Sequence, residues 1–193
     1  MEKSLLMQDS WRSNHGYEAM LDFQMSWLMR LAAEKNVEKK RLHQISNEVL
    51  LRLIGLLDTP NVVIERVEVW RQWEHIDVIA EVEVVVDGEK QHHLVVIEDK
   101  AYTMIHDNQL ERYSETVNAY YNGRHKKQYK IHCWVITFYD RDKNNKYWNM
   151  LDCKCKDLEW GLLSFYEVIG WEDGEFEDTE SDLFNEFWLR EWY

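Results

Sequence analysis

The chain of 193 residues is 45% hydrophobic and carries a net charge of −13 at pH 7. This hydrophobic content suffices for one buried core, and no apolar run reaches the length of a transmembrane helix or resembles a signal peptide. Three cysteines are too few, and odd in number, for a disulfide framework, so we expect a cytoplasmic protein without membrane attachment. The acidic balance argues against a protein that binds nucleic acid through electrostatic attraction alone.

Chain breakers are scarce, with one proline and seven glycines, and no Pro/Gly/Ser-rich linker divides the chain. We therefore predict a single domain over 1–193, with its core at about 40–140, an N-terminal helical segment at 1–35 and an acidic C-terminal helical segment at 172–193. The predicted elements, from helical or strand-like apolar spacing, are helices over 17–33 and 39–57, strands over 62–70, 76–86 and 90–98, a helix over 106–121, a strand over 130–139, and helices over 158–168 and 181–192. This order predicts an α/β fold, with a mixed sheet covered by helices on its faces.

A two-residue turn, Asp87-Gly88, joins the second and third predicted strands, and this pair is the strongest short signal for a β-hairpin. Asp77 lies ten residues before the turn and Glu98 ten residues after it, so their side chains face each other at a Cβ separation of about 5 Å. Lys100 follows two residues later and points to the same side of the sheet. Two facing carboxylates repel each other unless a positive charge lies between them. We therefore predict a site for a hard divalent cation, with Lys100 as a second positive charge.

Neighbouring residues extend this predicted site. Asp99 points to the opposite strand face, but its backbone carbonyl would point toward the cation. Glu81 shares the face of the two carboxylates, either as a further ligand or as a solvated residue. Gln109 and Tyr113 stand four apart in the predicted helix 106–121, so they share one helix face. From that face they can orient the lysine, a metal-bound water or a phosphate.

In combination these residues resemble the PD-(D/E)XK nuclease superfamily, whose αβββαβ core carries a metal site on its second and third strands. The resemblance covers about residues 40–140. The matching residues are Asp77 in HIDV, Glu98 and Lys100 in VVIEDK, Gln109 and Tyr113 in QLERY, and Glu48 in SNEVLLRLI. Glu48 corresponds to the acidic residue that this family often places on its first core helix, whereas Ile76 stands where the family has a proline. The resemblance implies a restriction-endonuclease-like core with extra N- and C-terminal helices.

The resemblance further implies a Mg²⁺-dependent nuclease that hydrolyses phosphodiester bonds, for which we expect DNA as the substrate and Mn²⁺ as a substitute ion. Asp77 and Glu98 would be metal ligands, and Glu48 would be an outer ligand or a ligand of a second ion. Lys100 would position or deprotonate water, or stabilise charge on the phosphate. Gln109 and Tyr113 would complete the catalytic set.

Charge is unevenly distributed along the chain. Residues 172–193 hold nine acidic residues and one arginine, so this segment carries −8 of the net charge. A short basic cluster stands out against that background, made of Arg124, Lys126, Lys127 and Lys130. The cluster is either a surface that binds substrate phosphates or a solvated loop. The aromatic C-terminal helix either packs within the chain or mediates a homo-oligomer or the binding of a protein partner.

An alternative hypothesis is an inactive acidic member of the same fold, which mimics nucleic acid or binds a protein. Binding of Mg²⁺ or Mn²⁺ separates the two hypotheses, because a mimic needs no ion. Other motifs give weaker signals. Cys153-x-Cys155 lacks the spacing of a structural zinc site, and His92-His93 would face opposite sides of a strand.

Overall fold

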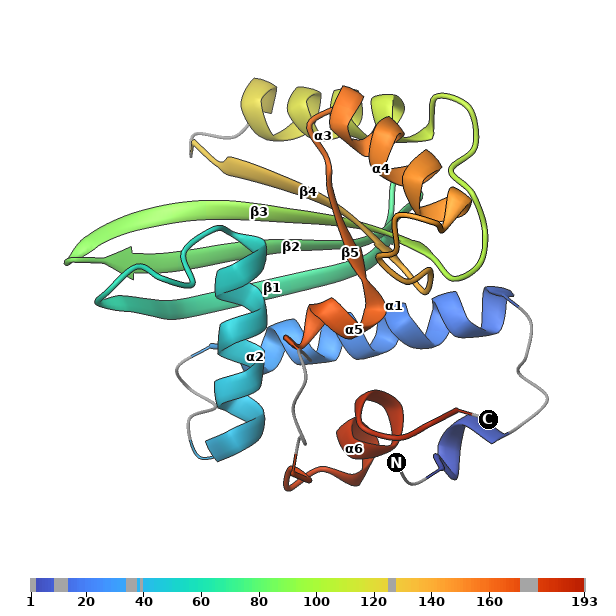
Figure 1. Ribbon diagram of the computed structural model, residues 1–193. Helices are drawn as coiled ribbons and strands as arrows, with labels where there is room; N and C mark the ends of the chain where they lie inside the picture. Colours follow the sequence, from blue (N-terminus) through green and yellow to red (C-terminus); the bar gives the residue numbers. More distant parts are fainter. Residues whose placement is uncertain are drawn as a thin grey trace.

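A five-stranded sheet forms the centre of the protein in the computed structural model, which describes residues 3–8, 14–33, 38, 40–124, 128–170 and 177–192. The strands are β1 (Val62–Trp73), β2 (Ile76–Val86), β3 (Glu89–Lys100), β4 (Lys130–Thr137) and β5 (Gly161–Ser164). They lie in the order β1-β2-β3-β4-β5 (Figure 1). β1, β2 and β3 pair antiparallel, whereas β4 and β5 are added in parallel. The predicted mixed α/β sheet is confirmed.

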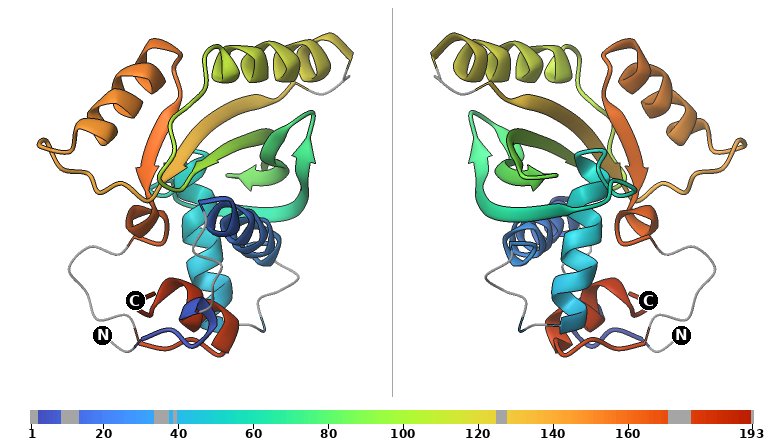
Figure 2. Two further views of the ribbon diagram at one scale, coloured as in Figure 1. Left: turned by 90° about the vertical axis from the view of Figure 1, so that its right-hand side faces the viewer. Right: turned by 90° about the vertical axis from the view of Figure 1, so that its left-hand side faces the viewer.

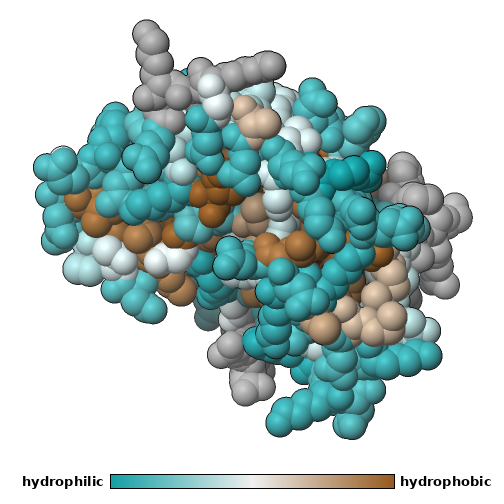
Figure 3. Space-filling view, turned by 90° about the horizontal axis from the view of Figure 1, so that it is seen from above, coloured by the Kyte–Doolittle hydropathy of each residue, from teal (hydrophilic) through white to brown (hydrophobic). Residues whose placement is uncertain are grey.

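Helices cover both faces of this sheet. They are α1 (Asn14–Leu31), α2 (Lys40–Leu53), α3 (Gln109–Arg124), α4 (Lys146–Asp157), α5 (Phe165–Val168) and α6 (Asp182–Trp188), with a 3₁₀ helix η1 at Leu6–Gln8. α1 and α2 lie on one face, and α3 and α4 lie on the other (Figures 1 and 2). Seen from the side of α3 and α4, the surface is mostly hydrophilic, with hydrophobic side chains in narrow patches (Figure 3). None of the described helices is both long and apolar enough to cross a membrane.

The hairpin of β2 and β3 has the register that the Asp87-Gly88 turn predicts. Both turn residues have positive φ, 49° for Asp87 and 87° for Gly88, as a tight two-residue turn requires. The strands pair without interruption from Val86 opposite Glu89 to Val78 opposite Ile97. Because no bulge intervenes, residues at equal distances from the turn stay on the same face of the sheet.

Side chains of β2 and β3 alternate between two hydrophobic clusters, one on each face. Val82 packs into the cluster beneath α1 and α2, whereas Ile79 and Leu94 pack into the cluster beneath α3. β3 is buried on both faces from His93 to Lys100. Its last three residues are charged and lie inside the protein, where charge is costly unless it is paired.

The C-terminal part of the fold differs from the prediction. The prediction of one helix over 158–168 is wrong, because 161–164 form strand β5 and only Phe165–Val168 are helical. Gly161 packs directly against the ring of Trp134, where any larger side chain would collide. Helix α4 was not predicted, although Asn145 caps it by accepting hydrogen bonds from the backbone N–H groups of its first turn.

The aromatic side chains of α6 pack within the chain. Phe184, Phe187 and Trp188 are fully buried, and the ring of Trp188 stacks on Phe165 with centroids 4.7 Å apart. Glu186 accepts hydrogen bonds from the N-terminal segment, including one of 2.9 Å from Ser4 Oγ, so α6 also joins the two ends of the chain. These three rings are therefore core residues.

Candidate active site

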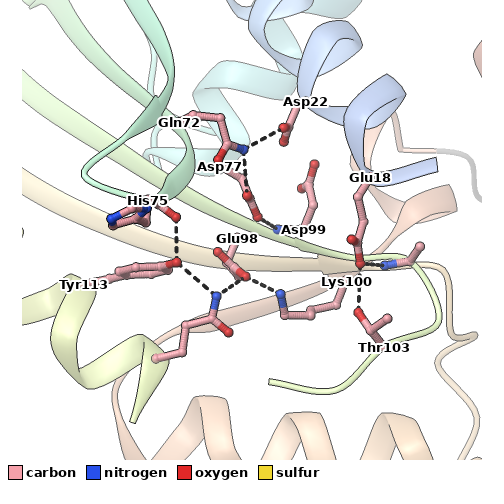
Figure 4. Close-up of polar contacts among 12 residues, drawn as sticks. Glu18, Asp22, Gln72, His75, Asp77, Glu98, Asp99, Lys100, Thr103 and Tyr113 are labelled. Carbon is pink, nitrogen blue, oxygen red and sulfur yellow. Dashed lines mark hydrogen bonds and ion pairs between the residues drawn. The ribbon is translucent and has the colours of Figure 1, made fainter. Parts of the chain in front are cut away.

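Asp77, near the start of β2, lies where β2, β3 and the end of β1 meet (Figure 4). Its Oδ2 accepts a hydrogen bond from the backbone N–H of Asp99 at 2.8 Å, just past the last regular pair, Val78 and Ile97. Its Oδ1 accepts a hydrogen bond from Gln72 Nε2 at 3.0 Å. Both carboxylate oxygens are therefore held by donors from neighbouring strands.

Glu98 lies beside Asp77 and is almost completely buried, with 1% of its surface exposed. Its Oε1 accepts hydrogen bonds from Lys100 Nζ and, at 2.5 Å, from Gln109 Nε2. Its Oε2 is buried without a hydrogen-bond partner among the described residues. Burial raises the pKa of Glu98 to about 8; the charge of Asp77 adds to this rise and Lys100 opposes it.

Lys100 is buried as well and forms an ion pair with Glu98. Burial alone would lower the pKa of Lys100, but the carboxylates of Glu98, Asp77 and Glu18 outweigh burial and raise the pKa above its usual value. The raised pKa favours the ammonium form of Lys100, which stabilises negative charge.

Gln109 and Tyr113, in the first turns of α3, contact the same cluster, as their spacing predicts. Figure 4 shows Tyr113 beside His75 and Glu98. Tyr113 Oη donates a hydrogen bond to the backbone carbonyl of His75 at 2.6 Å. Gln109 Nε2 donates to Tyr113 Oη at 3.0 Å as well as to Glu98. The hydrogen bonds thus form a continuous chain from the turn after β1, through α3, to Glu98.

Helix α1 contributes two carboxylates that the sequence analysis missed, Glu18 and Asp22 (Figure 4). Glu18 Oε1 accepts hydrogen bonds from the backbone N–H of Ala101 at 3.1 Å and from Thr103 Oγ1 at 2.8 Å. Asp22 Oδ2 accepts a hydrogen bond from Gln72 at 3.1 Å. The signal was present in the sequence, because these two acids stand four apart in a helix whose other positions are largely apolar.

Asp99 points away from Lys100, toward Asp22 on α1, which agrees with its predicted strand face (Figure 4). Burial, together with the charges of Asp22 and Asp77, raises the pKa of Asp99 well above its usual value. Burial likewise raises the pKa of Asp22 to about 6. A second acidic layer therefore lies behind the first, and Gln72 joins the two.

Two carboxylates that the sequence linked to this site lie elsewhere. Glu48 is exposed on α2 and accepts a hydrogen bond of 2.9 Å from Gln44, because α1, and not α2, crosses the sheet at the site. Glu81 accepts hydrogen bonds from the hydroxyl groups of Tyr121 at 3.1 Å and Tyr129 at 2.8 Å. The two tyrosines hold the Glu81 carboxylate, which is therefore not simply solvated.

Of the four residues of the predicted basic surface, only the side chain of Lys130 is described, and it lies far from the carboxylate cluster. Lys130 begins β4 and donates a hydrogen bond to Gln91. The strand partner of Lys100 is Thr137, at the other end of β4. Thr137 lies seven residues from Lys130, which is about 23 Å at about 3.3 Å per residue. Lys126, Lys127 and the side chain of Arg124 lie outside the described residues.

A mixed sheet flanked by helices, with acids and a lysine converging on its second and third strands, defines a restriction-endonuclease-like α/β protein. A sequence model of the PD-(D/E)XK nuclease superfamily matches residues 10–192, and the chain therefore belongs to this superfamily. The match starts upstream of the predicted core at about 40–140 and includes α1. Searches of curated proteins and of solved structures each found no match.

Members of this superfamily generally use divalent metal ions, and the residues at Asp77 suit such an ion in part. Among the described residues, no three side chains of His, Cys, Asp or Glu are arranged to hold a metal. Two carboxylates do lie side by side, and Glu98 Oε2 is buried with no partner in the described part of the chain. Mg²⁺ keeps several waters and takes as few as one or two carboxylates. Asp77 and Glu98 therefore supply two neighbouring carboxylates of the kind that bind a divalent metal ion.

Proposed function

We propose that the protein is a nuclease that hydrolyses phosphodiester bonds of DNA with Mg²⁺, for which Mn²⁺ can substitute. The observation that carries this proposal is the carboxylate of Glu98, which is buried beside Asp77 and contacted by Lys100 and Gln109. Burying several like charges together destabilises a fold, so a cluster of this kind is expected where function requires it. The superfamily match supports the same activity.

Each residue then has a distinct task. A bound ion would supply Lewis acidity toward the phosphate and lower the pKa of a bound water. Asp77 and Glu98 would hold that ion, and the Lys100 ammonium would stabilise negative charge that develops on the phosphate oxygens. Gln109 keeps Glu98 in place, and Tyr113 keeps Gln109 in place through the carbonyl of His75.

The test is incubation of the protein with supercoiled plasmid, linear duplex, single-stranded DNA and RNA, each with Mg²⁺, Mn²⁺ or EDTA. We expect DNA cleavage with either ion and none with EDTA. Lys100→Ala should abolish cleavage. Lys156→Ala is the matched control, because Lys156 also pairs with a carboxylate, Asp152, but on the exposed side of α4.

A second function is favoured by the net charge of −13, which suits an inactive protein that mimics nucleic acid or binds a protein partner. Calorimetric titration with Mn²⁺ separates the two. A nuclease should bind the ion through Asp77 and Glu98, so that Asp77→Ala abolishes the binding heat. Absence of both ion binding and cleavage in the wild-type protein would leave the acidic binding protein as the function.

A further inference from the structure

Arg71 lies in β1, next to Gln72, whose side-chain amide donates a hydrogen bond to the active-site carboxylate of Asp77. The strand partner of Arg71 is Val78, the residue that follows Asp77. Paired Cα atoms lie about 5 Å apart and successive ones about 3.8 Å apart, so the Cα atoms of Arg71 and Asp77 are separated by about 6 Å. Arg71 is therefore a neighbour of the candidate active site, although it has no task in the chemistry proposed above.

The charge of Arg71 is not paired inside the protein. Strands β1, β2 and β3 carry four arginine or lysine side chains, and three of them, Arg66, Lys90 and Lys100, pair with carboxylates. Arg71 is the fourth. Its side chain is exposed, and among the residues that the structure describes it forms neither an ion pair nor a hydrogen bond. Its N–H donors and its full positive charge are thus available to a ligand.

The Arg71 guanidinium is nevertheless held in one place. It lies over the ring of Phe23 on α1, with Cζ 5.8 Å from the ring centroid. A cation above an aromatic ring is attracted by the electrons of the ring. This attraction orders the long side chain but provides no acceptor for its N–H groups. Arg71 therefore presents a positioned set of donors beside the active site.

A second guanidinium lies nearby. Arg30, on α1, donates a hydrogen bond of 2.6 Å to the backbone carbonyl of Val69, two residues before Arg71. Burial lowers the pKa of Arg30, and the charge of Arg71 lowers it further, because the two cations repel each other. Asp22 also lies within range of the Arg71 charge, but it is buried and hydrogen-bonded to Gln72. This edge of the active site is therefore suited to an external anion.

The chemistry of Arg71 suits a phosphodiester group. A planar guanidinium donates two parallel hydrogen bonds to two oxygens of one phosphate. The chain has a net charge of −13, so a nucleic acid needs exposed cations at the active site to overcome repulsion. Lys100 is buried and already paired with Glu98. Arg71 offers the exposed contact that Lys100 does not.

We propose that Arg71 binds a non-scissile phosphate of the substrate strand, close to the cleaved bond, and that Phe23 holds the guanidinium in position for this contact. The proposal rests on the nuclease function proposed above. Nucleotides advance by about 3.4 Å each along a strand, so the contacted phosphate should lie within about three nucleotides of the cleaved bond. A phosphate contact reads no base, so it should strengthen binding to every sequence alike.

The first test measures binding without cleavage. The Lys100→Ala protein is titrated in Mg²⁺ with fluorescein-labelled single-stranded and duplex DNA, at KCl concentrations from about 50 to 200 mM, and anisotropy gives the affinity. Adding Arg71→Gln should weaken binding about tenfold at the lowest salt. It should also reduce the salt slope of the logarithm of affinity by about 0.7 for single strands or about 0.9 for duplexes. Arg71→Lys should restore the slope, because it keeps the charge.

The matched control for this test is Arg66→Gln. Arg66 is an exposed arginine of the same strand, but its charge is already paired with Glu68 and Glu83. Its replacement should leave the salt slope unchanged. Equal losses in the Arg66 and Arg71 variants would reveal a general effect of net charge and overturn the proposal. Absence of measurable DNA binding by the Lys100→Ala protein would overturn it as well.

The second test concerns Phe23. Phe23→Leu removes the ring but keeps an apolar side chain on α1, and it should weaken binding by about two- to fivefold, as expected for an exposed cation–π contact. In a protein that already carries Arg71→Gln, the same change should cause no further loss, because no guanidinium remains to be held. A loss of equal size in both proteins would contradict the role given to Phe23.

The third test locates the phosphate with the wild-type protein. A neutral methylphosphonate replaces one phosphate at successive positions of the DNA form that the protein cuts, and the products are sized. Besides its effect at its own bond, each replacement should suppress cleavage at one bond a fixed number of nucleotides away. In Arg71→Gln this second suppression should disappear, because no guanidinium senses the missing charge. Its persistence would assign that phosphate to another residue.

The source of the phosphate is tested by competition. Inorganic phosphate should compete only weakly with the labelled DNA, because it offers one contact and lacks the rest of the strand. Competition at equal concentration of phosphate groups would instead assign Arg71 to a small free anion and overturn the proposal.

The two proposals can fail separately. A protein that binds DNA with a salt slope that depends on Arg71, but cuts no nucleic acid with either ion, would refute the nuclease function and keep the phosphate contact. A protein that cuts DNA, and in which Arg71→Gln changes neither affinity nor salt slope, would refute the phosphate contact alone.

Discussion

Asp77 Oδ2 accepts a hydrogen bond of 2.8 Å from the backbone N–H of Asp99, at the point where the regular pairing of β2 and β3 ends. The other oxygen of Asp77 accepts a hydrogen bond from Gln72. The orientation of this carboxylate is therefore set by two strands before any ion binds. Mutation of a residue that orients a metal ligand in this way typically lowers metal affinity or activity about 10- to 100-fold.

Gln72→Leu is expected to weaken Mn²⁺ binding and to reduce cleavage by about 10- to 100-fold. Leucine has a similar size but no amide, so Asp77 and Asp22 lose their shared donor and repel each other. Calorimetry with Mn²⁺ and a cleavage assay measure the two effects. The control is Gln44→Leu, which removes a glutamine–carboxylate hydrogen bond on α2, far from the site, and should change neither. Unaltered Mn²⁺ affinity in Gln72→Leu would refute this positioning role.

Lys100→Ala is expected to reduce cleavage at least about 100-fold while Mn²⁺ binding stays within a few-fold of the wild-type affinity. The reason is that the role proposed for Lys100 is to stabilise charge on the phosphate and not to bind the ion. Asp77→Ala should lose both cleavage and Mn²⁺ binding, because it removes one of the two carboxylates proposed to hold the ion when no substrate phosphate is present. The same calorimetric and cleavage assays distinguish them, and full activity of Lys100→Ala would refute the assignment of this site.

The stability of the metal-free protein should fall as pH rises. The pKa of Glu98 is about 8 in the folded state against an ordinary value of 4.5, so between these pH values the folded protein keeps a proton that the unfolded chain has released. The contribution of Glu98 is therefore complete below about pH 4.5 and is lost on approach to pH 8, at a cost of order 5 kcal/mol.

Urea unfolding in EDTA at pH 5, 6.5 and 8 measures this decline. Glu98→Gln should flatten the profile, because the glutamine does not titrate. In the wild-type protein, Mg²⁺ affinity should rise over the same pH range, since the ion competes with the proton of Glu98. A free energy of unfolding that increases between pH 5 and 8 would show that Glu98 is already ionised in the folded protein.

Glu18→Gln is expected to reduce cleavage about tenfold or more, whereas Glu48→Gln should have no effect. Glu18 holds the backbone after Lys100 through Ala101 and Thr103, and its charge helps to keep Lys100 protonated. Glu48 is exposed on α2. Steady-state kinetics measures the cleavage rate of both variants. A loss in Glu48→Gln without a loss in Glu18→Gln would show that Glu48, and not Glu18, contributes to the active site.

The sequence alone determined the central pair of carboxylates. Asp77 and Glu98 are aligned by a two-residue turn, and the register of a hairpin follows from that turn because its contacts are local along the chain. Gln109 and Tyr113 were predictable for a similar reason, since residues four apart share a helix face. In each case the relative positions of the two residues follow from the geometry of a single hairpin or helix.

The tertiary structure decided which other groups join that pair. Glu18 and Asp22 reach the site because α1 crosses the sheet beside β1, and Gln72 reaches it near the end of β1, where its backbone has a positive φ of 55°. Strand β5 was missed because its four residues are defined by parallel pairing with β4, a contact between distant parts of the chain. Helix packing and parallel pairing depend on how all side chains fill one core, and no local pattern carries that information.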